Sequence, residues 1–440
     1  MANNTSPITI VGAGWAGLAA AVKLTQSGIP VNVFEAAPQP GGRARDIPLR
    51  NISLDNGQHI LTGAYKNVLH VLETAGVDLE EAFERLPLHL QLVNKQNKQY
   101  LLRATQLPAP LNLLTGLFGK TGIAIKHRIQ ITRLSLQLLS NPNSIAEQRT
   151  VQDWLGKHGQ DEELIKILWE PLCLAILNTP VAKASARIFL RVLKDSFLYK
   201  KKYSDLLYPR KTLSKLYVEP CIKYIERHGG KVFLNTRATE LVTENNRIKG
   251  IRFGDKGIKT DEVILTIPPH QVEGLLASNY QLGNLADQFR QFNYEPITTV
   301  YLQYPANIQL SQPMIGLLGT YSQWIVDRRY CGQPGLMAVV ISSSGPHMKL
   351  ERDQLALLVE KEIANIFPAW PKANSRLTIR EKRATFRSDT DVEFIRPENQ
   401  SSYHGLWFAG DYTDTGYPAT LEGAVSSAVS CANLLIELYR

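Results

Sequence analysis

The sequence predicts an α/β fold with a parallel sheet, on three observations. Residues 8–34 read as a strand, a glycine-rich turn, a helix and a second strand. Residues 229–269 read as short alternating strands, and residues 405–435 as a strand, a polar loop and a helix rich in small residues. With 440 residues, of which 44% are hydrophobic and 20% charged, the chain is long enough for two or more folded domains.

The first of these stretches contains a dinucleotide-binding fingerprint. Gly12, Gly14 and Gly17 form the pattern G-x-G-x-x-G directly after the expected strand Ile8 to Val11. Gly12 permits a tight turn, Gly14 lets a pyrophosphate approach the backbone, and Gly17 lets the following helix pack on the sheet. The free N–H groups at the start of that helix favour a phosphate. The second strand ends at Glu35, whose carboxylate can accept both hydroxyls of a ribose.

Later stretches contain further candidate ligand-binding residues. In the segment GGRAR, Gly42 permits a close backbone turn and Arg43 can pair with a phosphate. The stretch LDNGQHIL, residues 54–61, places polar residues between bulky apolar ones, so we expect this loop to face something other than water. Near the C-terminus, Gly410-Asp411 follows a strand, and the helix from about Thr420 carries small residues that suit the close approach of a flat ligand.

Taken together, these stretches resemble the flavin-containing amine oxidase and carotenoid desaturase superfamily. The resemblance implies FAD as the cofactor and a Rossmann-type FAD-binding domain assembled from three separated segments. It also implies an inserted substrate domain, mainly helical in one part and a β-sheet in the other. The predicted boundaries are 1–85, 206–280 and 396–440 for the FAD-binding segments, 86–205 for the helical part and 281–395 for the sheet part.

The resemblance also implies which residues contact FAD. The loop Gly57-Gln58-His59 matches a segment that passes beside the flavin ring, and Ala238 matches a position that touches adenine through its backbone. Gly410 and Asp411 match ribityl and pyrophosphate contacts. Leu421 and Glu422 lie where backbone groups approach the isoalloxazine ring. The predicted FAD-binding residues are Gly12, Ala13, Gly14, Trp15, Ala16, Gly17, Glu35, Ala36, Gly42, Arg43, Gly57, Gln58, His59, Ala238, Gly410, Asp411, Leu421 and Glu422. We expect non-covalent binding, because the loop GDYTDTGYPAT has no cysteine to form a thioether.

A narrower resemblance comes from DNGQHILTGAY and LNTPVAKASA, together with LWEPLCLAI and SDLLYPRKTLSKLYVEPCIKYIERHGGKV. These resemble the hydroxysqualene dehydroxylases, or squalene-associated FAD-dependent desaturases, over essentially the whole chain. The resemblance implies a long-chain isoprenoid substrate and reductive dehydroxylation of hydroxysqualene to squalene, in squalene and hopanoid biosynthesis. The alternatives are an isoprenoid desaturase of the phytoene type, an amine oxidase, and a lipid-bound flavoprotein without turnover.

Four residues are candidates for catalysis: Gln58, His59, Tyr412 and Tyr417. His59 is a candidate proton donor because the pKa of histidine is near neutrality, or else a structural residue that orients its own loop. Tyr412 and Tyr417 could stabilise a cation with their aromatic faces, or could pack the loop over the flavin. The chain has no second G-x-G-x-x-G, so the electrons come from the substrate, oxygen, a small reductase or a directly binding reduced nicotinamide.

The net charge of +9 is unevenly distributed along the chain. Between Glu84 and Glu147 there is no acidic residue, and basic residues alternate with apolar segments such as LNLLTGLFGKTGIAI. One interpretation is a buried helical pair with solvated lysines. The other is a face that contacts anionic lipid, which predicts a cytoplasmic enzyme bound peripherally to the inner face of the cell membrane. No binding motif accompanies the charge, so we do not expect nucleic acid as a partner.

The remaining patterns concern the substrate domain, the cysteines and the membrane. We expect strands near 297–304 and 335–342, and Thr150 with Asp153 resembles a capping box. The apolar residues between Leu168 and Ile176 are either ordinary core or the lining of a long tunnel. The four cysteines and nine histidines show no metal-ligand spacing, which predicts free thiols in a reducing compartment and no metal site. We expect neither a membrane span nor a signal peptide, because no long apolar run and no basic N-terminal region occurs.

Overall fold

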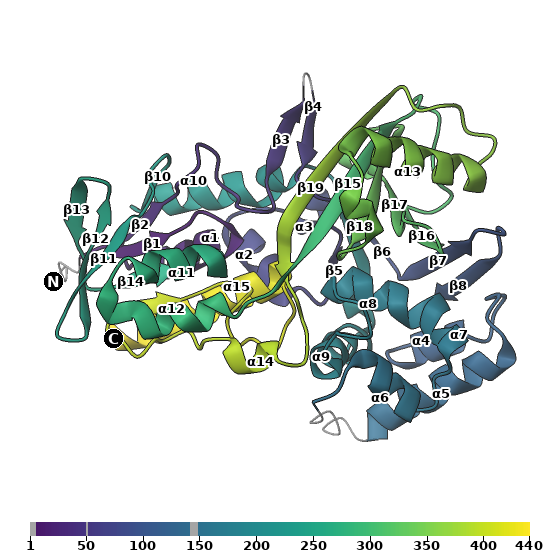
Figure 1. Cartoon of the computed structure of the whole chain (residues 1–440), viewed down its shortest axis with the longest axis horizontal. Coiled ribbons are helices and arrows are strands. Elements are labelled where there is room, and N and C mark those ends of the chain that lie inside the picture. Colours follow the sequence, from purple (N-terminus) through teal and green to yellow (C-terminus); the bar gives the residue numbers. More distant parts are fainter. Residues whose placement is uncertain (1–5, 50–51, 141–147) are drawn as a thin grey trace.

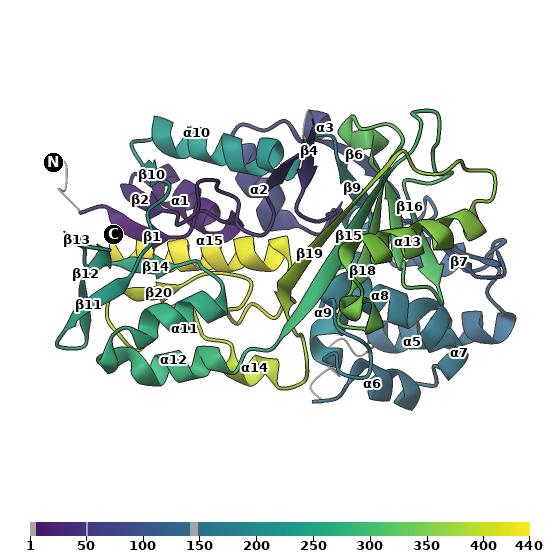
Figure 2. The same ribbon diagram turned by 45° about the horizontal axis from the view of Figure 1, so that its top comes forward.

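The computed structural model describes residues 6–49, 52–140 and 148–440 and is built around two large sheets. A five-stranded sheet forms the core of one half of the molecule, and a seven-stranded sheet forms the core of the other, as Figures 1 and 2 show. The α/β class is therefore confirmed. Two of the expectations concern residues that are not described. Residues 1–5, at the N-terminus where we expect no signal peptide, and residues 141–146, at the end of the acid-free stretch, lie outside the described residues.

The five-stranded sheet takes its strands from distant parts of the chain. Every neighbouring pair is parallel, so the carboxyl ends of the strands lie at one edge, which is where ligands bind in such sheets. The predicted strand–turn–helix–strand unit is confirmed, with α1 (Trp15–Gln26) between the first two strands. The strand order is β10 (Lys231–Phe233), β2 (Val31–Phe34), β1 (Ile8–Val11), β14 (Val263–Leu265) and β20 (Leu406–Phe408).

Helices cover both faces of this sheet (Figure 2). On one face α1, α10 (Glu219–Arg227) and α15 (Leu421–Leu438) form a core with the strand residues Ile10, Val33 and Ile264. On the other face α11 (Pro269–Ala277) and α12 (Gly283–Arg290) pack against Leu265 and Phe408. Apolar residues on both sides of β1, β2, β14 and β20 are what a buried parallel sheet requires, whereas the edge strand β10 is partly exposed.

The C-terminal helix α15 starts where it was predicted to start. The Thr420 hydroxyl accepts a hydrogen bond from the Gly423 N–H and so caps the helix. Among the described residues, α15 is the one helix long and apolar enough to cross a membrane by length and composition, yet half of that stretch is buried inside the protein. Its buried side packs with α1, so we interpret α15 as a core helix.

The seven-stranded sheet confirms the two strands expected near 297–304 and 335–342. Its order is β19 (Ser375–Phe386), β15 (Tyr294–Gln303), β18 (Leu336–Ser342), β17 (Trp324–Asp327), β16 (Met314–Leu318), β7 (His89–Asn94) and β8 (Gln99–Arg103). All of its pairings are antiparallel except β16 with β7. Helix α13 (Arg352–Ile366) packs on one face. The long strands β15 and β19 reach from this sheet toward the five-stranded one (Figure 1).

The region 86–205 is only partly helical, which corrects the prediction for its first residues. Residues 83–103 form β6 (Phe83–Leu86), β7 and β8, and the last two join the large sheet. The reason is tertiary: β7 pairs with β16, more than two hundred residues later in the chain, and no local pattern announces that pairing. The helices that follow are α4 (Leu111–Gly116), α5 (Ile125–Ser140), α6 (Val151–Lys157), α7 (Glu162–Leu164), α8 (Glu170–Leu177) and α9 (Ala186–Phe197). Helix α6 begins after Thr150, whose hydroxyl accepts the Asp153 N–H as predicted.

Smaller elements complete the fold. Strands β11 (Glu240–Glu244), β12 (Arg247–Phe253) and β13 (Lys256–Lys259) form the expected meander. The others are β3 (Asp46–Leu49), β4 (Ile52–Asp55), β5 (Leu61–Thr62), β9 (Leu206–Pro209), α2 (Lys66–Thr74), α3 (Leu79–Ala82), α14 (Val392–Ile395), the π-helical turns η1 (Ile165–Trp169) and η3 (Ser214–Val218), and the 3-10 turns η2 (Lys201–Tyr203), η4 (Tyr280–Leu282), η5 (Arg328–Cys331) and η6 (Pro346–Lys349). The five domain boundaries given above remain predictions.

Candidate active site

A cavity of about 1460 Å³ lies where the two halves of the molecule meet. One end is formed at the carboxyl ends of β1 and β2 and includes Gly12, Gly14 and Glu35. The other end is apolar and is lined from α8, α9 and the large sheet by side chains such as Leu172 and Trp324. The cavity therefore joins a polar end, shaped by backbone groups, to an apolar end. Of the predicted FAD-binding residues, all but Ala13 and Gly17 line it.

The glycines of the first turn have two different tasks. An added Cβ at Gly17 would lie 1.9 Å from the Gly12 carbonyl oxygen, so only glycine lets α1 approach β1 this closely. At Gly14 the nearest atom to an added Cβ is the Gly42 Cα, 3.9 Å away. The space beside Gly14 is therefore open, and the backbones of Gly14 and Gly42 border it. These two glycines, beside the N-terminus of α1, fit a pyrophosphate.

Glu35 is held in place and keeps hydrogen-bonding capacity for a ligand. One carboxylate oxygen accepts the Ala13 N–H at 2.8 Å and the other accepts the Ala37 N–H at 2.9 Å. A carboxylate has about four acceptor sites, so the remaining ones can accept hydroxyl groups. Glu35 lines the cavity, and this arrangement fits a ribose. Ala13 does not line the cavity but contributes through this hydrogen bond.

Arg43 joins three parts of the chain at the cavity wall. Its guanidinium forms an ion pair with Asp411 at 2.7 Å and donates a hydrogen bond to the Ala384 carbonyl oxygen at 2.8 Å. Its ionic partner within the chain is thus a carboxylate, and the phosphate contact expected from the sequence stays a prediction. The pair fixes Asp411, which is buried, against the loop that contains Arg43.

A second arginine, which the sequence did not single out, holds the loop after Asp411. Arg396 is 5% exposed and donates to the carbonyl oxygens of Asp411, Thr413 and Tyr417. Burial lowers the pKa of Arg396 to about 10, which still leaves it charged at neutral pH. Its donors replace the water that these carbonyl groups would otherwise need.

The loop after β4 is anchored by Arg328, a second buried arginine that the sequence analysis also missed. Arg328 is 3% exposed and forms an ion pair with Asp55 at 3.0 Å. It also donates to Gln58 Oε1 at 2.7 Å, while Gln58 Nε2 donates to the His59 carbonyl oxygen. Asp55 in turn accepts the Leu213 N–H. The polar loop therefore faces the cavity on one side and a buried ionic network on the other.

His59 is poised as a hydrogen-bond acceptor. Its Nδ1 lies 2.9 Å from the Gly57 carbonyl oxygen, and because a carbonyl can only accept, Nδ1 carries the proton. Burial lowers the pKa of His59, and the charges of Arg328 and Arg43 lower it further, against the opposing effects of Asp55 and the Gly57 carbonyl. A neutral imidazole of this tautomer has an unprotonated Nε2. The arrangement disfavours the proton-donor role considered for His59 above.

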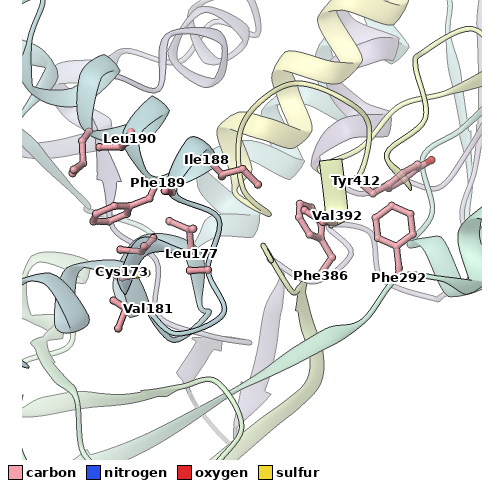
Figure 3. Close-up of a cluster of buried hydrophobic side chains, with 14 of the residues drawn as sticks. Cys173, Leu177, Val181, Ile188, Phe189, Leu190, Phe292, Phe386, Val392 and Tyr412 are labelled. Atoms are coloured by element: carbon pink, nitrogen blue, oxygen red, sulfur yellow. The ribbon is translucent and has the colours of Figure 1, made fainter. Parts of the chain in front are cut away.

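The two candidate tyrosines lie in different environments. Tyr412 is 1% exposed, donates to the Leu265 carbonyl oxygen at 2.8 Å and does not line the cavity. Figure 3 shows it packed beside Phe292, with Phe386 close by, and this position favours the packing role considered for Tyr412 over the catalytic one. Tyr417 does line the cavity, and its hydroxyl donates to Asp195 at 2.6 Å. Burial and this carboxylate raise the pKa of Tyr417 to about 12.

Glu422 couples the start of α15 to the start of α2. Its buried carboxyl group accepts the N–H groups of Asn67 and Val68, each at 3.0 Å, where the N-terminal end of a helix favours an anion. Burial nevertheless raises its pKa to about 7, against the lowering effect of these hydrogen bonds. The residue thus organises the cavity wall next to Leu421.

The apolar residues between Leu168 and Ile176, in η1 and α8, divide between the two roles considered for them. Leu168 and Trp169 are buried in the core, where the Trp169 N–H donates to Gln160 Oε1. Leu172, Leu174 and Ile176 line the cavity instead. The four cysteines are free thiols, as expected, and the described residues contain no group of three or more side chains arranged to hold a metal ion.

Comparison with known proteins identifies the family. Residues 15–436 match the family model described as flavin containing amine oxidoreductase. The chain belongs to this family. It is a FAD-dependent oxidoreductase, and the cavity described above, with its open glycine backbones and free carboxylate acceptors, is the part of the molecule that fits FAD.

Within the flavin containing amine oxidoreductases, the chain is similar to enzymes of isoprenoid metabolism. It is 27% identical to a hydroxysqualene dehydroxylase of Sinorhizobium fredii, over 98% of both chains, and 26% identical to one of Rhodopseudomonas palustris, over 98% of this chain and 99% of the other. It is 23% identical to a zeta-carotene desaturase of Synechocystis over 98% of this chain and 97% of the other.

Solved structures confirm the flavin amine oxidase-like fold. An oxidoreductase from Methanosarcina mazei has a TM-score of 0.75 at 16% identity and covers 97% of this chain and all of its own. The cyclohexylamine oxidase of Brevibacterium oxydans has a TM-score of 0.71 at 14% identity and covers 99% of this chain and all of its own.

Proposed function

We propose that this oxidoreductase acts on a C30 isoprenoid and converts hydroxysqualene to squalene by reductive dehydroxylation. The observation that carries the proposal is the similarity to hydroxysqualene dehydroxylases at 24–27% identity over nearly the full length of the chains. The cavity supports it, because an apolar wall suited to a hydrocarbon chain continues directly from the polar end that fits FAD.

The residues of the chain would divide the work along the cavity. Glu35, Gly14 and Gly42 would hold the ribose and pyrophosphate of FAD, and Asp411, fixed by Arg43, would contact its ribityl chain. Bound FAD, when reduced, supplies hydride. Leu172, Leu174 and Ile176 bind the isoprenoid chain and exclude water from a cationic carbon, while the ring of Tyr417 offers an aromatic face to such a charge.

A leaving hydroxyl would be held at the polar loop. Gln58 Nε2 has a second N–H beyond the one donated to the His59 carbonyl oxygen, and this N–H can donate to a substrate oxygen. His59 Nε2 can accept a hydrogen bond from that hydroxyl, which would leave as water once it takes up the proton that accompanies the hydride of the reduced cofactor. Both groups are fixed, Gln58 by Arg328 and His59 by the Gly57 carbonyl oxygen. A site that hydrogen-bonds a hydroxyl discriminates against substrates that lack it.

The test uses anaerobic holoenzyme whose FAD has been reduced beforehand. Addition of hydroxysqualene should restore the absorbance of oxidised flavin, with squalene formed in equal amount. Gln58→Leu should slow this step by about tenfold through the loss of one hydrogen bond while FAD stays bound. Gln152→Leu, a change on the exposed surface of α6, serves as the control and should leave the rate unchanged.

The second candidate is an isoprenoid desaturase, favoured by the similarity to zeta-carotene desaturase. The same experiment separates the two. If hydroxysqualene leaves the reduced flavin unchanged while a phytoene-like polyene bleaches the oxidised flavin, the enzyme is a desaturase.

A further inference from the structure

Exposed apolar side chains are concentrated in one region of the chain, whose helices α4 and α5 lie at the same end of the molecule (Figure 1). Within the acid-free stretch, Phe118 is 69% exposed, Ile125 73% and Leu111 51%, and Leu107 and Ile129 are exposed too. They belong to α4, α5 and the segments beside them. Solvent-exposed apolar residues that cluster in this way mark an interaction surface. The interpretation of this stretch as a buried helical pair is therefore wrong for these residues.

A basic turn from another part of the chain lies next to this surface. Lys201 donates to Gln106, which precedes the exposed Leu107. Lys201 belongs to the run Lys200-Lys201-Lys202, and the neighbouring Tyr199 is 61% exposed. Lysines and an exposed tyrosine beside apolar side chains are the residue types found where a protein meets lipid headgroups. We call this surface, residues 107–129 with 199–202, the apolar–basic face.

Not every basic residue of the acid-free stretch adds to the positive charge of the apolar–basic face. The Lys126 ammonium forms ion pairs with Asp161 at 3.4 Å and with Glu163 at 3.1 Å. The run 200–202 and Lys120 are therefore better candidates for contact with an anionic surface.

The inner side of the same region reaches the large cavity. The turn 199–202 connects Phe197 to Leu206, and both of these residues line the cavity. A second hollow, of about 330 Å³, is bounded by residues that include His89, Arg103 and Tyr208. Leu88 and Leu206 line both spaces, so two leucine side chains separate the hollow from the cavity. Leu113 of α4 packs against the cluster that Leu88 and Leu206 form with Tyr208.

From this arrangement we propose that the apolar–basic face docks on the anionic surface of a lipid bilayer, and that the isoprenoid passes between bilayer and cavity through the hollow, past Leu88 and Leu206. The inference rests on the proposed function, since it takes the substrate to be a hydrocarbon dissolved in the bilayer. The positive charges orient the protein on anionic headgroups, and the apolar side chains enter the acyl boundary. Through this passage, a water-insoluble isoprenoid can move from the bilayer to the cavity without entering water.

The docking test needs no turnover. Holoenzyme is floated with vesicles of phosphatidylcholine alone or of phosphatidylcholine and phosphatidylglycerol in equal parts. Wild type should bind the mixed vesicles, and binding should weaken at high salt. The variant Lys200→Gln/Lys201→Gln/Lys202→Gln should lose roughly tenfold or more in affinity, because each lysine near an anionic surface contributes to binding. Leu111→Ser/Phe118→Ser/Ile125→Ser should lose binding to a similar extent.

The matched lysine control lies on β12 and β13, at the opposite end of the molecule from α4 and α5 (Figure 1). The variant Lys249→Gln/Lys256→Gln/Lys259→Gln removes three exposed lysines of β12 and β13. Leu357→Ser/Phe394→Ser removes two exposed apolar side chains elsewhere. Both should bind like wild type. Equal binding by all variants, or equal binding of wild type to neutral and mixed vesicles, overturns the proposed docking.

The passage is tested with radiolabelled squalene, transferred from mixed vesicles to the holoenzyme. Leu88→Trp should slow the transfer by about tenfold or more, as expected for a filled constriction, and Leu88→Ala should not slow it. FAD content and absorbance report that both variants are folded. Unchanged transfer in a folded Leu88→Trp variant rejects the passage. If vesicle binding and transfer behave as expected but hydroxysqualene is not converted, the proposed reaction fails while the face and passage stand.

Discussion

At the scale of single residues, the buried arginines decide how the site is built. Arg328 contacts Asp55, Gln58 and Gln333 from the interior, and Arg396 fixes the loop after Asp411. Neither could be predicted from the sequence, because Arg328 and Asp55 are 273 positions apart and an isolated arginine carries no local pattern. Tyr412 illustrates the reverse case: its position beside Asp411 is apparent in the sequence, but the direction of its side chain depends on Phe289 and Phe292.

Replacement of Arg328 tests this network. Arg328→Met leaves Asp55 buried without its partner, and loss of one member of a buried ion pair costs about 3–5 kcal/mol. We expect the free energy of unfolding, measured with urea, to fall by about that amount. The double variant Arg328→Met/Asp55→Asn removes the unpaired charge and should recover part of the loss. A single variant as stable as wild type would show that the pair contributes nothing to folding.

At the scale of elements, local patterns specify β1, α1 and β2, because turn, helix and strands are adjacent in the sequence. The same holds for the start of α15. The hairpin of β7 and β8 could not be predicted, because its position in the large sheet depends on pairing with β16. The meander of β11 to β13 could be predicted from its pattern, but its role at the cavity came only from the family resemblance. Sequence reasoning therefore found most of the FAD end of the cavity but could not resolve its apolar end.

The β1–α1 turn allows a prediction with an internal control. Gly14→Ala places a methyl group in open space, so the protein should remain folded but bind FAD at least about tenfold more weakly, since the backbone can no longer approach the pyrophosphate. Gly17→Ala forces a Cβ against the Gly12 carbonyl oxygen and should lower the melting temperature of the apoprotein. Circular dichroism of the apoproteins and fluorescence titration with FAD measure both effects. Unfolding of the Gly14→Ala apoprotein would contradict the division of roles between the two glycines.

At the scale of the whole molecule, the cofactor cavity is a place where distant parts of the chain meet. Gly14, Ala238 and Gly410 line one continuous space, although more than 150 positions separate each from the next. Arg43 and Asp411 tie the first and last parts together directly. A ligand that touches all of these segments binds only the folded arrangement, so its binding free energy adds to the stability of the whole molecule.

We therefore expect FAD to stabilise the entire chain in a concentration-dependent way. At a free FAD concentration of 1,000 times Kd the added stability is about 4 kcal/mol, and the melting temperature of the holoenzyme should rise with each increase in FAD. In Glu35→Ala the N–H groups of Ala13 and Ala37 lose their acceptor, and the ribose of FAD loses the carboxylate that accepts its hydroxyls. The same FAD concentration should therefore raise the melting temperature of this variant less than that of the wild type. Differential scanning fluorimetry across a series of FAD concentrations, with AMP as a control that occupies only the nucleotide end, measures the effect. A melting temperature that does not respond to FAD would mean that the cofactor does not hold these segments together.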